Sequence, residues 1–163
     1  MTRLKNQIFL VALLLTIGFT SCKKEVYNPN FEDLRVALEV EVQSNGDVLF
    51  TYVEENLTSE RIEYSRSTSC PVERVIVYQN GEVVDVLAPE AVCTADIPRG
   101  FLEPNSSFRD ERSWMDVPDH SALEPGTYTA EMVVGIGLVH YAGTDNESEE
   151  WDNFTLTQEF TVQ

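Results

Sequence analysis

Cys70 and Cys93 are a pair of cysteines whose chemistry the sequence constrains. Three states are open to them: a disulfide, a pair of free buried thiols, or a redox couple. A redox couple usually has a C-x-x-C spacing, which this chain lacks. In an exported protein, where thiols oxidise, two such cysteines favour a disulfide. We therefore predict that they are bonded, and that closing this loop stabilises the fold by roughly 3 kcal/mol.

His120 and His140 are the two histidines of the chain. His120 stands near Asp116 and Asp119, so a metal or acid–base role is conceivable. A metal site needs further ligands at fixed spacing, and neither H-E-x-x-H nor a Cys/His cluster occurs. We expect His120 to be an exposed loop residue and His140, near a strand end, to be structural. We predict no metal and no cofactor.

Residues 142–152 form an acidic stretch that contains Asp145, Glu149 and Trp151. Its carboxylates could bind calcium, but the ordered D-x-D-x-D-G spacing of an EF-hand loop is absent, which favours a solvated charge run. If Trp151 is exposed, it is the best single residue to contact a sugar or a protein partner. Trp151, Asp145 and Glu149 are therefore the candidate binding residues, whereas Trp114 is expected to pack against the core.

Motifs of nucleophilic and phosphate chemistry are missing from the sequence. It has no G-x-S-x-G elbow and no G-x-x-x-x-G-K-[ST] loop. Gly135-Ile136-Gly137 lies within a predicted strand, where glycines indicate a bulge or a close backbone approach. We expect no enzymatic activity, since a hydrolase would need a carboxylate pair or a triad converging in a pocket.

The first 21 residues have the three parts of a secretory signal peptide. Arg3 and Lys5 are basic, residues 8–19 are apolar, and small residues follow at Thr20 and Ser21. The apolar run is shorter than the roughly 20 residues of a permanent membrane-spanning helix. The alternative, a buried N-terminal helix of the domain, is disfavoured by this combination of charged, apolar and small residues.

The sequence Phe19-Thr20-Ser21-Cys22 resembles a lipobox, the processing site of bacterial lipoproteins, with Phe19 at the position where Leu is usual. The resemblance implies cleavage before Cys22, a thioether-linked diacylglycerol on its sulfur and a third acyl chain on its amino group. Two or three chains anchor a protein stably, whereas one holds it marginally. Lys23, in place of Asp, implies transport to the outer membrane of a Gram-negative cell envelope. We expect residues 22–33 to be the lipidated cysteine and a flexible tether.

The charge balance of the chain is strongly acidic. Its formal net charge is −17, from 28 acidic and 11 basic residues. Arg3 and Lys5 are lost with the signal peptide, so the mature part is more acidic still. Such a surface repels nucleic-acid phosphates and anionic lipid headgroups, which excludes nucleic acid as a partner. The membrane is expected as a partner only through the lipid anchor.

Residues 34–163 are predicted to form one all-β domain. Apolar and polar residues alternate over 34–42, which gives that strand one core face and one wetted face. Asn45-Gly46 and Asn80-Gly81 predict hairpin turns. About seven to eight strands, with turn signals roughly every ten residues, favour a single antiparallel immunoglobulin-like β-sandwich. Two of these strands are expected at 128–141 and 154–162, with an acidic loop between them.

The stretch 74–128 resembles the BsuPI-like domains, named for a Bacillus intracellular proteinase inhibitor. The resemblance lies in an ordered series: the 77–83 hairpin, Val92-Cys93-Thr94, the turn at 101–105, Phe108 and Trp114, and Pro125-Gly126-Thr127-Tyr128. Asn105 replaces the family's glycine and tolerates the same left-handed conformation. The resemblance implies an immunoglobulin-like sandwich and, as an alternative function, protease inhibition. It carries over no inhibitory residue.

These features predict a lipid-anchored, non-catalytic binding module of the cell envelope, whose partner is an extracytoplasmic protein or a glycan. Its specificity is expected in the loops at 93–100, 116–125 and 142–152, presented by rigid sheets. A protease inhibitor is the alternative, and a hydrolase or a carbohydrate-binding accessory protein is less favoured.

Overall fold

The computed structural model describes residues 31–72, 74–88, 92–95 and 97–163. The signal peptide, Cys22 and most of the expected tether lie outside these residues. Within the described part, the chain forms nine strands: β1 (Leu34–Val42), β2 (Val48–Asn56), β3 (Ile62–Arg66), β4 (Val75–Gln79), β5 (Glu82–Leu87), β6 (Arg99–Leu102), β7 (Ser107–Ser113), β8 (Gly126–His140) and β9 (Ser148–Val162). Every strand pairing is antiparallel. The all-β, antiparallel sandwich is confirmed, with nine described strands where seven to eight were expected.

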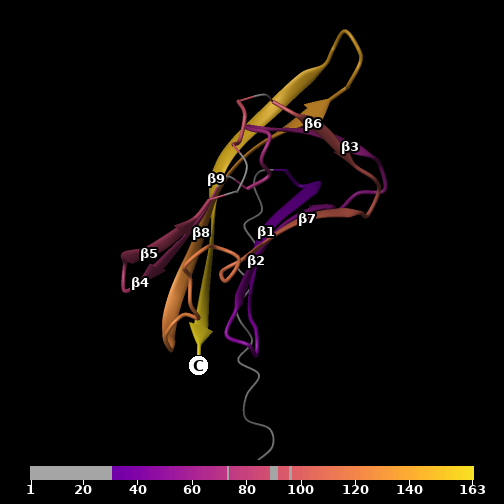
Figure 1. Ribbon diagram of the computed structural model, residues 1–163. Coiled ribbons are helices and arrows are strands. Elements are labelled where there is room, and N and C mark those ends of the chain that lie inside the picture. The colour runs from indigo at the N-terminus through magenta and orange to yellow at the C-terminus, as the bar shows by residue number, and fades with distance from the viewer. Residues whose placement is uncertain (1–30, 73, 89–91, 96) are drawn as a thin grey trace, which may run out of the picture.

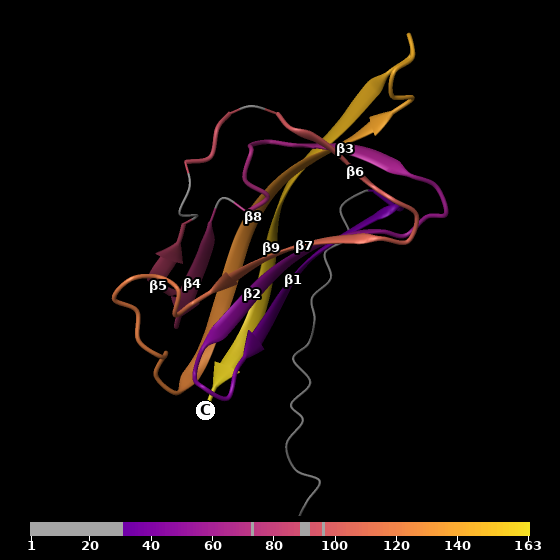
Figure 2. The same ribbon diagram turned by 45° about the vertical axis from the view of Figure 1, so that its right-hand side comes forward.

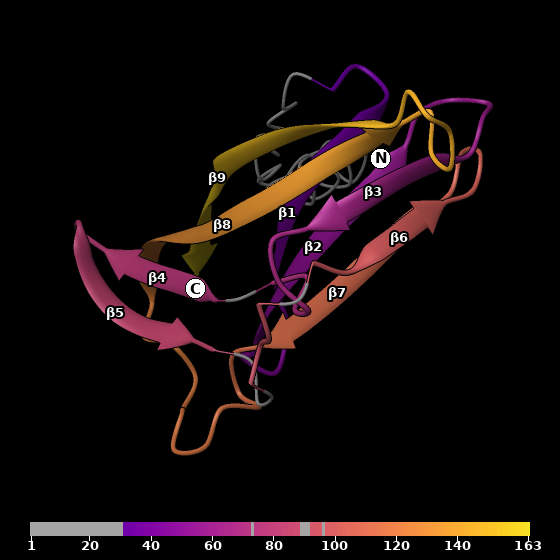
Figure 3. The same ribbon diagram turned by 90° about the horizontal axis from the view of Figure 1, so that it is seen from above.

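The two sheets have different architectures. The smaller sheet has the order β1-β2-β7, with β2 in the centre. The larger sheet is built around β8, which pairs along its whole length with β9. The other edge of β8 is shared: β4 pairs with Thr129–Met132 and β3 pairs with Ile136–Val139. As Figure 3 shows, β5 and β6 therefore extend this sheet at opposite ends of β8.

The core lies between the sheets and follows the period of two that the sequence predicts. In β9, even-numbered residues from Phe154 to Val162 are buried and the odd-numbered ones are exposed. Phe160 packs edge-to-face on Phe50 of the facing sheet, with ring centroids 5.8 Å apart. Phe31 is only 3 % exposed and belongs to the same core, so packing begins three residues ahead of β1.

The hairpin of β8 and β9 runs the length of the molecule, and its tip projects beyond the other strands in Figures 1 and 2. The expectation of a loop over 142–152 is wrong in part, because β9 begins at Ser148. From Ser148 to Asn153 neither face of the strand is buried. Alternation of apolar and polar residues is therefore absent there, although the backbone pairs regularly with β8.

The turns follow the expected chemistry, with one shift. Asn80 and Gly81 have φ values of 53° and 81°, which suits a tight hairpin between β4 and β5. Asn105 has a φ of 54°, the left-handed conformation expected of the residue that replaces a glycine. β6 precedes the turn around Asn105. The sequence pattern places residues 101–105 in that turn, but the first two of them belong to β6. β6 is short, with four residues, and its mixed composition gives no strand signal.

Candidate functional site

A cleft with a volume of about 610 Å³ opens where β7 of the smaller sheet faces the end of β5 in the larger one. Four consecutive residues of β7, Asp110–Ser113, form one wall. The other lining residues come from the last position of β5 and from three connections: Leu87 from β5, and Ser69, Cys70, Pro71, Ala88, Asp116, Val117 and Pro118 from the connections. Segments far apart in the sequence thus converge on one concave surface, partly apolar and partly charged.

The disulfide of Cys70 and Cys93 braces one side of this cleft. The two Cα atoms are 5.3 Å apart, so the predicted bond is confirmed. It joins the connection between β3 and β4 to the connection between β5 and β6. Two hydrogen bonds lie beside it: the Ser69 N–H donates to the Thr94 carbonyl at 3.1 Å, and the Thr94 N–H donates to Ser69 Oγ at 2.9 Å. The cleft wall is therefore held covalently as well as by backbone bonds.

Asp110 and Arg112 supply the charged wall of the cleft. Their register partners on β2 are Tyr52 and Phe50, whose side chains are fully buried, so Asp110 and Arg112 also point inward between the sheets. An Arg112 nitrogen lies 3.1 Å from Asp110 Oδ2. That oxygen is buried and has no hydrogen bond of good geometry within the described structure. The pair is neutral overall, and its contact at Asp110 Oδ2, next to the cleft, is an ion pair without a well-formed hydrogen bond.

His120 holds the connection between β7 and β8 against β5. The expectation that it is exposed is wrong, because its side chain is 11 % exposed. Its ring packs on Trp114, with centroids 4.3 Å apart, and Nε2 lies 2.6 Å from Asp85 Oδ2. Trp114, as predicted, is in the core, and its Nε1–H donates to the Ser121 carbonyl at 2.8 Å. These contacts fix the segment that carries Asp116, Val117 and Pro118 of the cleft.

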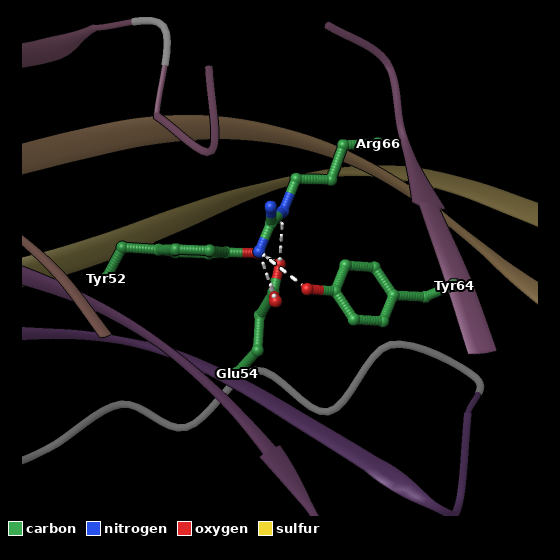
Figure 4. Close-up of polar contacts among 4 residues, drawn as sticks. All are labelled: Tyr52, Glu54, Tyr64 and Arg66. Carbon is green, nitrogen blue, oxygen red and sulfur yellow. Dashed lines mark hydrogen bonds and ion pairs between the residues drawn. The ribbon is translucent and has the colours of Figure 1, made fainter. Parts of the chain in front are cut away.

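A second polar group, shown in Figure 4, is buried between the sheets. Glu54 of β2 is fully buried and accepts hydrogen bonds from Tyr52 Oη at 2.7 Å and from Arg66 Nε and Nη2 at 3.0 and 2.8 Å. Arg66 of β3 also donates to Tyr64 Oη at 2.8 Å. The cluster therefore links the two sheets through one carboxylate, a bidentate guanidinium and two phenols.

The pKa values of Tyr52, Tyr64 and Arg66 in this cluster are shifted in directions that keep each group in one protonation state. Burial, followed by the charge of Glu54, raises the pKa of Tyr64 to about 12 and raises that of Tyr52 well above its usual value. Burial acts to lower the pKa of Arg66, but its hydrogen bonds and ion pair with Glu54 outweigh burial and raise it. Both phenols thus stay neutral and the guanidinium stays charged at physiological pH. Because the members satisfy one another, the arrangement is suited to fixing the two sheets together.

Trp151 lies on the outer face of the larger sheet, opposite Gly137 of β8. A Cβ atom on Gly137 would lie 2.8 and 2.9 Å from the two carbons shared by the indole rings, so the indole lies across the glycine. This explains the second glycine of Gly135-Ile136-Gly137 as a close approach by a side chain. Trp151 is 38 % exposed, as a contact residue requires.

Of the candidate binding residues, the structure brings Glu149 and Trp151 together and leaves Asp145 apart. Glu149 is two residues from Trp151 on the same face of β9, and its Cγ also approaches Gly137. Asp145 is exposed in the turn at the tip of the hairpin. His140 is near this tip, with Nε2 3.5 Å from Glu150 Oε2. None of these residues lines the cleft.

Asp110 and Arg112 of the cleft and the Glu54 cluster are absent from the sequence-based predictions. The sequence could have revealed Glu54, because Val48, Phe50, Tyr52 and Glu54 are alternate residues that share the inward face of one strand. This pattern predicts a buried carboxylate. For Asp110 and Arg112 no such signal exists, since their strand alternates charges with charges. Of the expected binding loops, 116–125 lines the cleft through Asp116, Val117 and Pro118. No described residue of 93–100 lines it, and that loop is joined to the lining residue Cys70 only through the disulfide of Cys93.

Neither a metal-binding cluster nor a membrane-spanning helix occurs in the described residues. No group of three or more His, Cys, Asp or Glu side chains there could hold a metal ion. Nor does any helix in the described part have the length and apolar character that crossing a bilayer requires.

Comparison with known proteins gives distant structural similarity only. No family model matches the sequence, and no curated protein matches it. Among solved structures, the chain is similar to the GAE domain of GGA2p from Saccharomyces cerevisiae, with 13% identity, a TM-score of 0.33, and coverage of 82% of this chain and 96% of that one. It is also similar to a protein from Archaeoglobus fulgidus, with 13% identity, a TM-score of 0.28, and coverage of 85% and 98%. At these TM-scores the two structures bring no function to this chain.

Proposed function

We propose that this protein is a lipid-anchored, immunoglobulin-like module of the cell envelope that binds an extracytoplasmic partner in the cleft between its sheets. The observation that carries the proposal is the cleft itself. Its volume of about 610 Å³ lies within the usual range of ligand sites, and its lining combines apolar side chains with a few polar groups. The anchor on Cys22 would hold this site near a membrane surface.

The construction of the cleft favours recognition. The Cys70–Cys93 disulfide braces one side, and the His120–Asp85 contact fixes the segment on another. A site with rigid walls loses little conformational entropy when a partner binds. Its charged residues on β7 pair with each other, an arrangement that suits hydrogen bonding to a partner more than proton transfer.

The experiment compares capture by two variants of the full, lipidated chain. Val117→Arg places a long cation in the cleft, whereas Val133→Arg places it on the outer face of β8, where Val133 is 45% exposed. Each protein carries a photo-crosslinker at Pro118 and is irradiated in intact cells, and the cross-linked species are identified by mass spectrometry. We expect one set of partners for wild type and Val133→Arg, reduced at least tenfold for Val117→Arg. Equal cross-linking by all three proteins would remove the cleft as the binding site.

Protease inhibition is a second candidate, favoured by one feature. The Cys93 segment is pinned by the disulfide, yet Val92 and Ile97 are 90% and 59% exposed. An inhibitory loop needs this combination of a fixed backbone and an accessible side chain. Incubating the protein with a panel of serine proteases tests the idea. Inhibition that is lost in Val92→Asp would support it, and full protease activity at every molar ratio would remove it.

A further inference from the structure

The outer edge of β7 borders the cleft and carries backbone groups that no other strand uses. In the smaller sheet β7 pairs with β2 on one side, and among the described residues it has no strand on the other. A strand edge of this kind presents a row of N–H and C=O groups to which another extended chain can pair. The same residues, Asp110–Ser113, form a wall of the cleft.

The register identifies the residues that present these groups. The Trp114 N–H donates to the Val48 carbonyl at 2.9 Å, and the Asn56 N–H donates to the Ser106 carbonyl at 2.9 Å. Hydrogen-bonded and non-hydrogen-bonded pairs alternate in an antiparallel ladder. The even-numbered residues of β7 therefore bond to β2, and the backbone groups of Arg109, Glu111 and Ser113 point toward the free edge.

The cleft lies beside this edge and would receive side chains from an added strand. Alternate side chains of a strand point to opposite faces of its sheet. If a strand is added next to β7, the side chains on its inner face would enter the space lined by Leu87, Val117 and Pro118. Asp110 Oδ2, buried and without a well-formed hydrogen bond, and the Arg112 guanidinium lie beside the same space. A peptide with an apolar residue flanked by polar residues would match this lining.

We propose that an extended peptide segment of a partner protein adds to the free edge of β7 and places an apolar side chain in the cleft; this rests on the proposed binding function. An extended backbone is the ligand whose donors and acceptors repeat at the spacing of a strand edge. The charges of β7 select among peptides. Arg109 and Glu111 carry opposite charges on the outer face of β7, and Asp110 and Arg112 carry opposite charges on the inner face, so a segment with complementary charges at the facing positions is attracted and a like-charged one is repelled.

The test uses a displayed library of random 12-residue peptides, selected on the full lipidated chain in nanodiscs. Residue-resolved hydrogen exchange then compares the free and peptide-bound protein. We expect the amides of Arg109, Glu111 and Ser113 to become protected at least tenfold on binding. The amides of Asp110 and Arg112 already bond to β2 and should change little. This odd–even pattern distinguishes strand addition from binding through side chains.

Two variants separate the backbone from the side chain at position 111. Glu111→Pro removes an N–H that points away from β2, so the ladder to β2 keeps its bonds. Glu111→Gln keeps the N–H and removes the charge. We expect the selected peptide to lose at least tenfold in affinity with Glu111→Pro and less than threefold with Glu111→Gln. Val117→Arg, which leaves β7 unaltered, should also weaken binding and serves if the proline variant does not fold.

Several outcomes would overturn the proposal. They are selection of no peptide, unchanged exchange at the three odd-numbered amides, or equal affinity for Glu111→Pro and wild type. If the chain forms a dimer without peptide and these amides are protected in it, the strand that adds to β7 comes from a second copy of the chain and not from a partner protein. If Val117→Arg abolishes cross-linking in cells while Glu111→Pro does not, strand addition fails and the binding function stands. If neither variant alters cross-linking, both fail.

Discussion

Nε2 of His120 lies 2.6 Å from Oδ2 of Asp85, which joins the β7–β8 connection to β5. The other ring nitrogen, Nδ1, lies 3.0 Å from the Trp114 carbonyl. A carbonyl and a carboxylate are both hydrogen-bond acceptors, so the ring is held at both of its nitrogens. His120 thus ties β5 to Trp114, the residue that follows β7, at one border of the cleft.

Replacing Asp85 by Asn should destabilise the protein at neutral pH and have no effect in strong acid. The Val86 N–H, and then His120, lower the pKa of Asp85 below its ordinary value of 3.8, against the effect of burial. A carboxyl whose pKa is lowered by folding contributes stability above its unfolded pKa, and that contribution is lost as the pH falls through the folded pKa. Because Asp85 is 47 % exposed, we expect less than about 1 kcal/mol at pH 7.

Urea unfolding of wild type and Asp85→Asn at neutral pH and at about pH 2.5 checks this expectation. Asp145→Asn, in the exposed turn, is the matched control and should resemble wild type at both pH values. A difference between wild type and Asp85→Asn that persists unchanged in acid would contradict the assigned pairing.

Removal of Arg66 should be among the most destabilising substitutions outside the apolar core. Arg66→Met leaves the fully buried Glu54 carboxylate without its cation, which costs about 3–5 kcal/mol in comparable buried pairs. The double variant Glu54→Leu/Arg66→Met should be less destabilised, because no buried charge remains. Arg35→Met is the control: its ion pair with Glu55 has side chains 26% and 37% exposed, so its loss should cost at most about 1 kcal/mol.

Chemical denaturation of wild type and of these three variants measures the contribution of the Glu54–Arg66 pair to stability. If Arg66→Met and Arg35→Met lose similar amounts of stability, the cluster of Figure 4 does not link the sheets through a buried charge pair.

Reduction of the disulfide should lower the free energy of unfolding and loosen one wall of the cleft. The bond joins residues 23 positions apart, and closure of a loop of that size contributes roughly 3 kcal/mol in the chain-entropy model. Cys70→Ala/Cys93→Ala avoids free thiols and should show the same loss in the absence of reductant. Reductant should have no effect on this variant. A double variant as stable as wild type would show that the bond contributes nothing to folding.

Gly137→Ala should displace the indole of Trp151. A Cβ atom at this position would approach the middle of the indole to 2.8 Å, closer than carbon atoms pack, and the exposed ring is the group able to move. We expect a red-shifted emission and stronger quenching by iodide, with a stability loss of about 1 kcal/mol. Trp114 is 4 % exposed and supplies a constant background. Trp151→Phe gives that background alone, and a Gly137→Ala spectrum identical to that of wild type would place the indole elsewhere.

The parts of the fold that a period of two could reveal were predictable from the sequence. The strands at 34–42 and 154–162 alternate because one face is buried, and the disulfide followed from the number and spacing of cysteines. The distal part of β9 was not predictable, because a strand exposed on both faces has no alternation. The burial of His120 was not predictable for a related reason: it depends on Trp114 and on Asp85, which lies 35 residues away.

The cleft was beyond the reach of sequence patterns for a topological reason. It forms because β7 pairs with β2 while its neighbour in sequence, β6, pairs with β3 in the other sheet. The chain therefore changes sheets between Leu102 and Ser107, and the free edge of β7 comes to face β5. A pattern of residue types specifies which face of a strand is buried but not which strand lies beside it.

The lipid anchor is central to the proposed function, and the direct measurement is the intact mass and N-terminal peptide of the protein purified from its own membranes. We predict a chain that begins at Cys22 with a diacylglyceryl thioether and an acylated amino group, and a Cys22→Ser variant that is not acylated. A native chain that begins at Met1 and carries no acyl group would contradict this prediction.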